Sequence, residues 1–298
     1  MSNKRSLTAI VCEGGGQRGI YTAGVLDTFQ KQDFNPFELA FGVSAGAQNL
    51  LVYCLGLPGY ARTAIEELTA APDFLVLHRC LLGRNMMDLD GYFARTTGDS
   101  KYRLPYERVN ELCGKCRLFF VATHRRTLRP VYLEPDKTTV FDSLKASSAM
   151  PVLYKSGVAI GGQRLIDGGV GDPLPIEQAY RSGARKILVI RTNTAEFAKQ
   201  KHWSARLIRR YTKRRLTSGL SLNILDMLEH HELAHQRTQA FIQSPPDDLE
   251  LQIVHPKSPL SSRILRSQPE ALLSDYKTGC KDGLQLIRTL ESWQEKVV

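Results

Sequence analysis

A serine held between two glycines is the first candidate for chemistry. The segment Gly42-Val43-Ser44-Ala45-Gly46 follows a short apolar run and precedes a run rich in Ala and Leu. In a G-x-S-x-G pattern between a strand and a helix, the glycines leave room for a sharp turn that lifts the serine oxygen above the sheet. Such a serine attacks an ester carbonyl once a neighbouring base accepts its proton. Ser44 is therefore predicted to be a nucleophile, with Gly42 and Gly46 shaping its turn.

A candidate base for that serine follows another apolar stretch. Asp167 comes directly after Leu165-Ile166 and is followed by Gly168 and Gly169. An aspartate at the end of a strand places its carboxylate at the carboxyl edge of the sheet, where α/β folds bind their ligands. Taken alone, the same segment could be an ordinary Asp-Gly turn. Together with Ser44, Asp167 is predicted to act as the general base.

A glycine-rich turn completes this chemistry. The segment Gly14-Gly15-Gly16-Gln17-Arg18-Gly19 joins an apolar run to a segment with helical periodicity. Its glycines let the backbone approach a ligand, and amides at a helix N-terminus stabilise negative charge. The segment also satisfies the G-x-G-x-x-G pattern of dinucleotide sites, and a turn without a ligand is the simplest alternative. Because a serine turn follows it, we predict that this segment stabilises the oxyanion formed by acyl transfer.

In their order and spacing, these motifs resemble those of the patatin-like phospholipases, which are serine lipid acyl hydrolases with a Ser-Asp dyad and no catalytic histidine. The resemblance covers roughly residues 7 to 192. The matching blocks are the glycine-rich motif with its basic residue (Gly14 to Gly19, with Arg18), the serine turn (Gly42 to Gly46), the A-S-x-x-x-P block (Ala146 to Pro151) and the D-G-G/A motif (Asp167 to Gly169). One departure is Asp172 before Pro173, where the family often has Asn.

The resemblance implies a mechanism and a substrate class. Ser44 would attack the acyl carbonyl, Asp167 would accept and return its proton, and the Gly14 to Gly19 turn would hold the oxyanion. No metal or organic cofactor would be needed. The implied substrate is a phospholipid, a lysophospholipid or another acyl ester. The C-terminal third of the chain lies outside the resemblance, so its role is not implied.

The elements that must position these residues can be predicted from apolar periodicity. Strands are expected over residues 7–12, 39–43, 118–123, 129–133, 158–166 (as a hairpin), 186–191 and 249–254. Helices are expected over residues 20–32, 45–55, 142–148, 176–181 and 269–295, and within 200–243. This alternation predicts a layered α/β/α fold with a largely parallel central sheet. We expect an acyl hydrolase domain at 5–195 and a mainly helical C-terminal region at 196–298.

Histidines leave other hydrolytic mechanisms open. The segment His231-Glu232-Leu233-Ala234-His235 satisfies H-E-x-x-H, which places two imidazoles on one helical face as zinc ligation requires. The further Gly and His of the extended zinc motif are missing, so a polar helix face is the simpler interpretation. A Ser-His-Asp triad would combine Ser44 and Asp167 with one of His202, His230, His231, His235 or His255. A non-catalytic lipid-binding scaffold is a further alternative.

Three features bear on the compartment of the protein. The apolar run near the N-terminus is too short for the core of a signal peptide, which predicts a cytoplasmic protein. The uncharged stretch from Leu39 to Ala61 contains several glycines and polar residues, so we interpret it as a strand, turn and helix and not as a membrane span. The six cysteines are predicted to be reduced thiols, and Cys113-Gly-Lys-Cys116 lacks the second pair that a zinc site needs.

The positive charge of the chain is concentrated in one segment. The 298 residues include 40 Lys and Arg against 30 Asp and Glu, a formal net charge of +10. Eight of these bases and no acid lie between Lys199 and Arg215. A basic helix with Trp203 on its apolar side suits an anionic membrane surface, so we expect peripheral contact with the inner face of the membrane through residues 199–215. Solvated bases on a packed helix are the alternative, and no nucleic-acid binding is expected because no binding motif is present.

Overall fold

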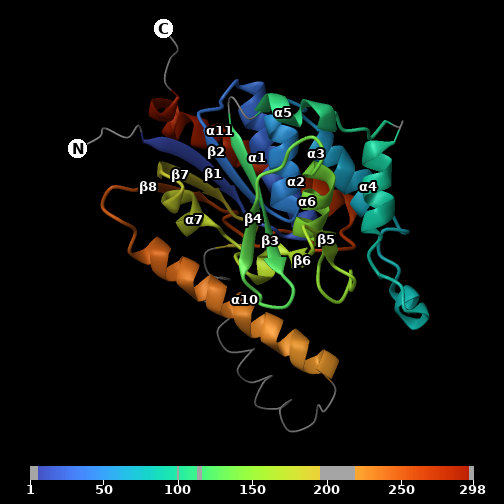
Figure 1. The fold of residues 1–298 in the computed structure, drawn as a ribbon. Helices are drawn as coiled ribbons and strands as arrows, with labels where there is room; N and C mark the ends of the chain where they lie inside the picture. Colours follow the sequence, from blue (N-terminus) through green and yellow to red (C-terminus); the bar gives the residue numbers. More distant parts are fainter. Residues whose placement is uncertain (1–5, 99–100, 113–115, 195–218, 295–298) are drawn as a thin grey trace.

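The computed structural model describes residues 6–98, 101–112, 116–194 and 219–294 (Figure 1). The basic segment 199–215, His202 and Cys113 of the C-x-x-C pair lie outside these ranges. No helix in the described part of the chain is long and apolar enough to cross a membrane. The uncharged stretch from Leu39 to Ala61 instead forms a buried strand and a helix, as predicted.

One mixed sheet of eight strands runs through the described chain. Its strands follow the order β5-β6-β3-β2-β1-β7-β8, and β4 pairs with β3 beside this path. The parallel strands are β1 (Leu7–Cys12), β2 (Leu39–Val43), β3 (Arg117–His124), β7 (Ala184–Ile190) and β8 (Glu250–Val254). The strands β4 (Pro130–Leu133), β5 (Val158–Ile160) and β6 (Gln163–Asp167) pair antiparallel. Each predicted strand is confirmed to within two residues.

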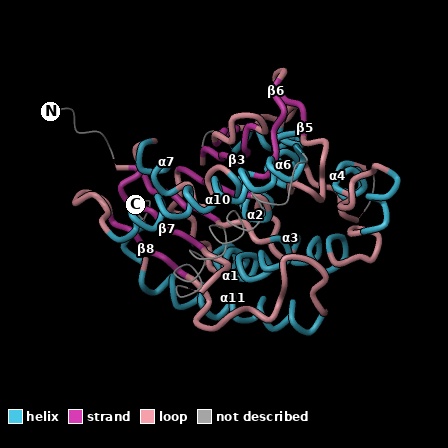
Figure 2. The backbone as a smooth tube through the Cα atoms, turned by 90° about the horizontal axis from the view of Figure 1, so that it is seen from below, coloured by secondary structure: helices cyan, strands magenta, loops and turns pink. Residues whose placement is uncertain are grey.

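Helices cover both faces of this sheet, which confirms the predicted α/β/α layers (Figure 2). Side chains alternate along the strands: Ile10 and Ala40 belong to one apolar core, whereas Ala9 and Phe41 belong to the other. The first core is covered by α1 (Gly19–Lys31), α2 (Ala45–Cys54), α4 (Leu89–Thr97), α6 (Val140–Ser148) and α11 (Pro269–Thr289). The second is covered by α7 (Ile176–Arg181) and the end of α10 (Gly219–Gln243). The short helices α3 (Tyr60–Thr63) and α5 (Val109–Leu112) lie in the connection between β2 and β3.

Residues after position 195 contribute to the same layers. Strand β8 extends the sheet by pairing in parallel with β7. Helix α11 packs directly on α1, since a Cβ atom on Gly279 would lie 2.1 Å from the carbonyl oxygen of Tyr21. The division into two domains near residue 195 stays a prediction, but residues from both sides of it build one sheet and contribute to both apolar cores.

Candidate active site

Ser44 occupies a strained turn at the end of β2. Its backbone has φ 53° and ψ −120°, a conformation that residues other than glycine rarely adopt. The turn is possible only because the residues two positions away on either side lack side chains: a Cβ on Gly42 would lie 2.4 Å from the Cα of Ala47, and one on Gly46 would lie 2.4 Å from the carbonyl oxygen of Cys12. Strand β2 and helix α2 therefore hold the serine as the sequence pattern predicts.

The A-S-x-x-x-P block at the end of α6 fixes this turn from the side. The backbone N–H of Ser44 donates to Oγ of Ser147 at 2.9 Å, and the Ser147 hydroxyl donates to the carbonyl of Val121 in β3 at 2.6 Å. The same block contacts the aspartate motif, because the N–H of Asp167 donates to the carbonyl of Ala149 at 2.9 Å. The block thus joins the serine turn and the aspartate turn.

Asp167 is the last residue of β6, and it lies opposite Ala122 of β3. Its carboxylate accepts a hydrogen bond from the Gly169 N–H at 2.8 Å. Burial raises its pKa to about 6, while hydrogen bonds from the Gly169 N–H and from the Ser44 side chain act in the opposite direction. The structure therefore brings Ser44 and Asp167 together. The pKa of the carboxylate lies near neutral pH, and a general base is most effective when its pKa is close to the working pH.

The glycine-rich turn runs alongside the nucleophile. A Cβ atom on Gly14 would lie 3.3 Å from Cβ of Ser44, and one on Gly16, whose φ is 57°, would lie 2.2 Å from the carbonyl oxygen of Ile264. Gly14, Gly15, Gly16 and Arg18 line the cleft that contains Ser44 and Asp167. The glycine-rich turn therefore lies beside the serine in the same cleft, as its predicted role requires.

Two residues of the glycine-rich turn, Gln17 and Gly19, do not line this cleft and instead contact the structure around the turn. Gln17 is buried, donates to the carbonyl of Thr69 and accepts from the N–H of Ser267. Gly19 accepts a hydrogen bond from the Asn49 side chain, and a Cβ on it would lie 3.0 Å from Cβ of Ala45. These contacts fasten the turn to its surroundings.

Two charged side chains that the sequence analysis did not select, Glu13 and Arg191, line the same cleft as Arg18. Glu13 accepts hydrogen bonds from the Thr192 backbone at 2.6 Å and from the Asn193 side chain at 3.2 Å. Arg18 donates to Oδ1 of Asn193 at 2.5 Å, and burial lowers its pKa although the charge of Glu13 opposes this shift. Arg191, at the end of β7, also lines the cleft. Glu13 and Arg191 each follow a strand, and this position was the only sequence signal that could have selected them. Neither belongs to a recognised motif.

Ser44 lies where two cavities meet. The polar cleft, with about 830 Å³ of space including its opening to solvent, contains the charged side chains described above. An apolar pocket, with about 740 Å³ of space including its opening to solvent, begins at the same serine and extends into the first core. Its lining includes Val52, Ile65, Phe74, Leu89, Phe93 and Leu104. A bound acyl ester can therefore divide between an apolar and a polar compartment, with its carbonyl at the junction.

Helix α10 brings the H-E-x-x-H segment to this cleft. His231 and His235 line it with their rings stacked, the centroids being 6.4 Å apart. Nδ1 of His231 contacts the carbonyl of Gly169, beside the aspartate. No group of three or more His, Cys, Asp or Glu side chains that could hold a metal occurs among the described residues. The two histidines therefore line the same cleft as Ser44 and Asp167, and they are not simply part of a solvated polar helix face. The described residues provide no third ligand for zinc.

Comparisons with known proteins show what the chain is similar to. The family model of the patatin-like phospholipases matches residues 10–180, and a model described as a domain of unknown function (DUF6363) matches residues 222–295. Over 283 residues the chain is 38% identical to the uncharacterized protein YjjU of Escherichia coli (strain K12), a match that covers 95% of this chain and 77% of that protein. The crystal structure of VipD from Legionella pneumophila matches with a TM-score of 0.47 and 14% identity, covering 95% of this chain and 67% of that one.

Proposed function

Since the chain belongs to the patatin-like phospholipase family, we propose that it is a serine lipid acyl hydrolase in which Ser44 and Asp167 form the catalytic dyad. One observation carries this proposal. The Ser44 side chain, held in a strained turn, reaches the Asp167 carboxylate at the point where an apolar pocket and a polar cleft meet. This is the arrangement that hydrolysis of an ester with a long acyl chain requires.

The reaction proceeds in two halves. Oγ of Ser44 attacks the acyl carbonyl while its proton passes to Asp167, and the negative charge on the carbonyl oxygen faces the amides of Gly14 to Gly16 and the N-terminus of α2. Asp167 then returns the proton to the oxygen of the leaving alcohol, which departs and leaves an acyl group on Ser44. In the second half, Asp167 takes a proton from water, and the resulting attack releases the fatty acid and restores the serine.

Asp167 can perform this role without a histidine because burial raises its pKa to about 6. A carboxylate with the usual value near 3.8 would be a much weaker base toward the serine hydroxyl. At neutral pH the raised value still leaves the group ionised. No metal or organic cofactor takes part in the proposed mechanism.

The two cavities indicate the substrate class. The apolar pocket suits an acyl chain, and the polar cleft suits the alcohol part of a phospholipid, a lysophospholipid or a related ester. We further propose that the enzyme is cytoplasmic and contacts the inner face of the membrane, with the basic segment 199–215 adding attraction to anionic lipid. We propose no binding of nucleic acid.

The test compares hydrolysis of lysophosphatidylcholine and a short p-nitrophenyl ester by the wild type, Ser44→Ala and Ser274→Ala. Ser274 is an exposed serine on α11 and serves as the matched control. Loss of both activities in Ser44→Ala alone supports the proposal. Activity that survives in Ser44→Ala contradicts it, and a wild type that binds these lipids without hydrolysing them indicates the scaffold alternative.

A further inference from the structure

A buried arginine of the catalytic cleft has donors that the protein does not use. The side chain of Arg191 is only 4% exposed, and it lines the cleft together with Ser44 and Asp167. No described residue accepts a hydrogen bond from its Nε or Nη2. Nε of Arg18, in the same cleft, is also buried without an acceptor among the described residues.

The carboxylates of the cleft are already engaged elsewhere. Glu13 accepts hydrogen bonds from Thr192 and Asn193, and Asp167 accepts one from Gly169. Because a guanidinium stays charged at all physiological pH values, burying it without an acceptor is costly. Its planar N–H groups match the oxygens of a phosphate, and they can donate two parallel hydrogen bonds. Among the described residues, Nε and Nη2 of Arg191 therefore have no acceptor, whereas Arg18 has the charge of Glu13 nearby and donates to Asn193.

Building on the proposed function, we infer that Arg191, assisted by Arg18, binds the phosphate group of a glycerophospholipid or lysophospholipid whose acyl chain lies in the apolar pocket. The phosphate enters the polar cleft on the alcohol side of the scissile ester. Arg191 thereby makes the enzyme prefer phosphate-bearing esters over neutral ones.

The experiment measures kcat/KM of the wild type, Arg191→Gln, Arg191→Lys and Arg181→Gln for lysophosphatidylcholine and for a monoacylglycerol of the same acyl chain. Arg181 is an exposed arginine on α7 and serves as the control. We expect Arg191→Gln to lower kcat/KM for the phosphate ester by on the order of 10- to 100-fold, which is the range for a charged hydrogen bond, and to leave the neutral ester within about threefold. Equal losses on both esters would assign Arg191 to the oxyanion and overturn the inference.

A second measurement does not depend on the variant folding. Glycerol 3-phosphate should slow labelling of wild-type Ser44 by a fluorophosphonate probe, whereas glycerol at the same concentration should not. Equal effects of the two compounds contradict the phosphate site while leaving the nucleophile in place. If Ser44 is not labelled at all, the proposed function itself fails, so the two failures can be distinguished.

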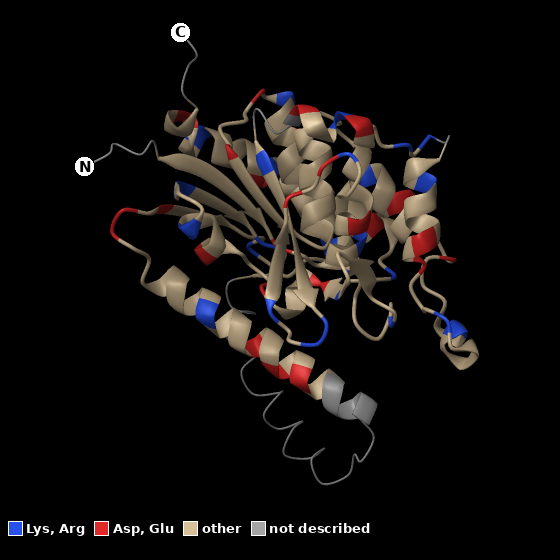
Figure 3. Cartoon of the chain, in the orientation of Figure 1, with Lys and Arg blue, Asp and Glu red and all other residues tan. Residues whose placement is uncertain are grey.

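An independent feature is a leucine-rich segment between Phe74 and Met87, two residues that line the apolar pocket. Residues 77–84, which we call the leucine lobe, contain the short helix Leu77–Leu82 and project from the body beside α4 (Figure 1). Leu77, Leu81 and Leu82 are 48%, 84% and 70% exposed, and no residue of this short helix is buried. Arg79 lies between Leu77 and Leu81, where it pairs with Asp88 at 3.3 Å, and Arg84 follows Leu82; the basic residues of the lobe stand out in Figure 3.

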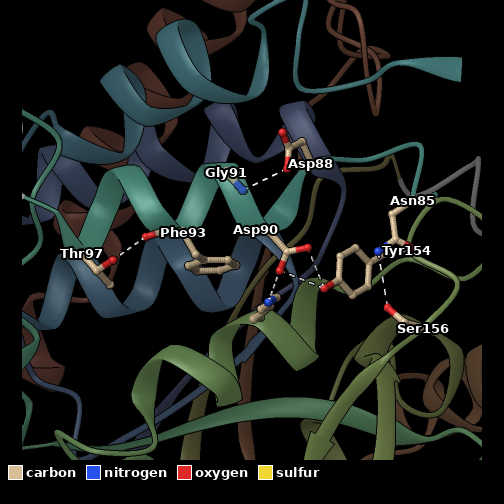
Figure 4. A network of polar contacts seen from close by, with 9 residues as sticks. Asn85, Asp88, Asp90, Gly91, Phe93, Thr97, Tyr154 and Ser156 are labelled. Carbon is tan, nitrogen blue, oxygen red and sulfur yellow. Dashed lines mark hydrogen bonds and ion pairs between the residues drawn. The ribbon is translucent and has the colours of Figure 1, made fainter. Parts of the chain in front are cut away.

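The base of the lobe is firmly attached to the body. The chain pairs with itself through the Leu75–Met87 bridge, and the N–H groups of Met86 and Met87 donate to the carbonyl of Leu153. Figure 4 shows the polar network beside it, in which Asn85 contacts Ser156 and the Asp88 side chain caps α4 by accepting from the Gly91 N–H. An attached base favours a fixed position for the exposed leucines.

Asp90 extends this network to α6 and the following loop. Its carboxylate accepts a hydrogen bond from the Tyr154 hydroxyl at 3.1 Å and pairs with Lys145. The wall of the apolar pocket continues into the base of the lobe, because Phe74 and Met87 line that pocket. The base of the leucine lobe therefore adjoins the pocket that begins at Ser44.

We propose that the leucine lobe inserts its leucines into a bilayer that contains anionic lipid. Exposed leucines gain free energy when they enter the boundary between head groups and acyl chains, and bases beside them are attracted to anionic head groups. Seated in this way, the lobe places the apolar pocket next to the membrane that supplies the acyl chain.

Cosedimentation with phosphatidylcholine vesicles, with and without phosphatidylglycerol, tests this surface. The variant carrying Leu81→Ser and Leu82→Ser should bind both kinds of vesicle on the order of 10- to 100-fold more weakly than the wild type. Leu284→Ser, which changes a 43% exposed leucine on α11, should bind like the wild type, and all three proteins should hydrolyse a short soluble ester equally. Unchanged vesicle binding by the double variant overturns the proposal. A double variant that differs from the wild type only in its oligomeric state also overturns it.

Discussion

The apolar pocket and the polar cleft meet at Ser44, yet they come from different parts of the chain. Residues between β2 and α6 supply most of the apolar pocket, for example Val52, Ile65 and Phe93. Strand ends and the C-terminal region supply the polar cleft, as Arg191 and His231 illustrate. The motif residues lie at the boundary between them. Chemistry and specificity are thus separable: changes at the boundary should affect every substrate, whereas changes in one cavity should affect one part of the substrate.

The largest effect is expected at the boundary itself. Ser44→Ala should lower kcat by at least about 1,000-fold for neutral and phosphate-bearing esters alike, because no other group forms the acyl intermediate. Steady-state hydrolysis of both classes checks this. A loss confined to one class would show that Ser44 belongs to one cavity and not to the boundary.

Asp167 should show the next largest effect, and it should depend on pH. With a pKa of about 6, the wild-type base is ionised above that value and protonated below it. Activity should therefore fall about tenfold per pH unit below about pH 6, and Asp167→Asn should be nearly inactive at all pH values. The pH profile of kcat/KM measures this, and a profile without an acidic limb near the stated pKa would contradict the assignment.

Asp167→Asn, although nearly inactive, should have a higher free energy of unfolding than the wild type above about pH 6. The native pKa lies above the ordinary value of 3.8, so the folded protein holds the proton more tightly than the unfolded chain between pH 3.8 and about 6. Above this window the buried charge costs folding free energy. Asp167→Asn should therefore be more stable by about 2 to 3 kcal/mol at about pH 8.

Denaturant titrations of the wild type and Asp167→Asn at several pH values check this gain. The difference should diminish as the pH falls through the window, and it should vanish below about pH 3.8, where both side chains are neutral. An advantage that is independent of pH would show that the carboxylate charge is not its cause.

The boundary could be predicted from the sequence, whereas the two cavities could not. Strand β2, its serine turn and the aspartate at the end of β6 follow from short apolar runs and from glycines that permit close backbone contact. Each signal is local. The cavities depend on packing between distant segments: Phe74 and Leu104 reach one pocket from different loops, and Arg191 lies in the cleft because β7 ends there.

The positions of the histidines show the same limit of prediction from sequence. Helical spacing predicts that His231 and His235 share a face, and they do. It cannot predict that α10 crosses the strand ends and aims that face at the dyad, because this depends on where the helix packs. The contact between His231 and Gly169 is long-range and has no local signature.

The apolar pocket can be altered without touching the boundary. Ala64 is buried and lines this pocket, so Ala64→Phe should fill part of its volume. We expect kcat/KM for long-chain acyl esters to fall by about tenfold, while esters of two to four carbons change by less than about twofold, because only long chains reach that depth. A series of p-nitrophenyl esters checks the length dependence. Equal losses at every length would indicate that the pocket does not hold the acyl chain.

The smallest effect is expected at the histidine face of the polar cleft. His231 contacts the Gly169 carbonyl, so His231→Ala should loosen the aspartate turn and lower kcat by less than about tenfold. A metal chelator should have no effect. Hydrolysis assays with and without chelator decide between mechanisms, since a loss as large as that of Ser44→Ala would support a Ser-His-Asp triad, and inactivation by the chelator would support zinc.

The most direct test of the central claim is to identify the residue that a fluorophosphonate probe modifies. Intact-protein mass spectrometry and peptide mapping would be applied to the wild type, Ser44→Ala and Asp167→Asn. The account predicts a single adduct on Ser44 in the wild type, none in Ser44→Ala and strongly slowed labelling in Asp167→Asn. An adduct on another residue, or undiminished labelling of Ser44→Ala, would contradict the claim that Ser44 and Asp167 form the catalytic dyad.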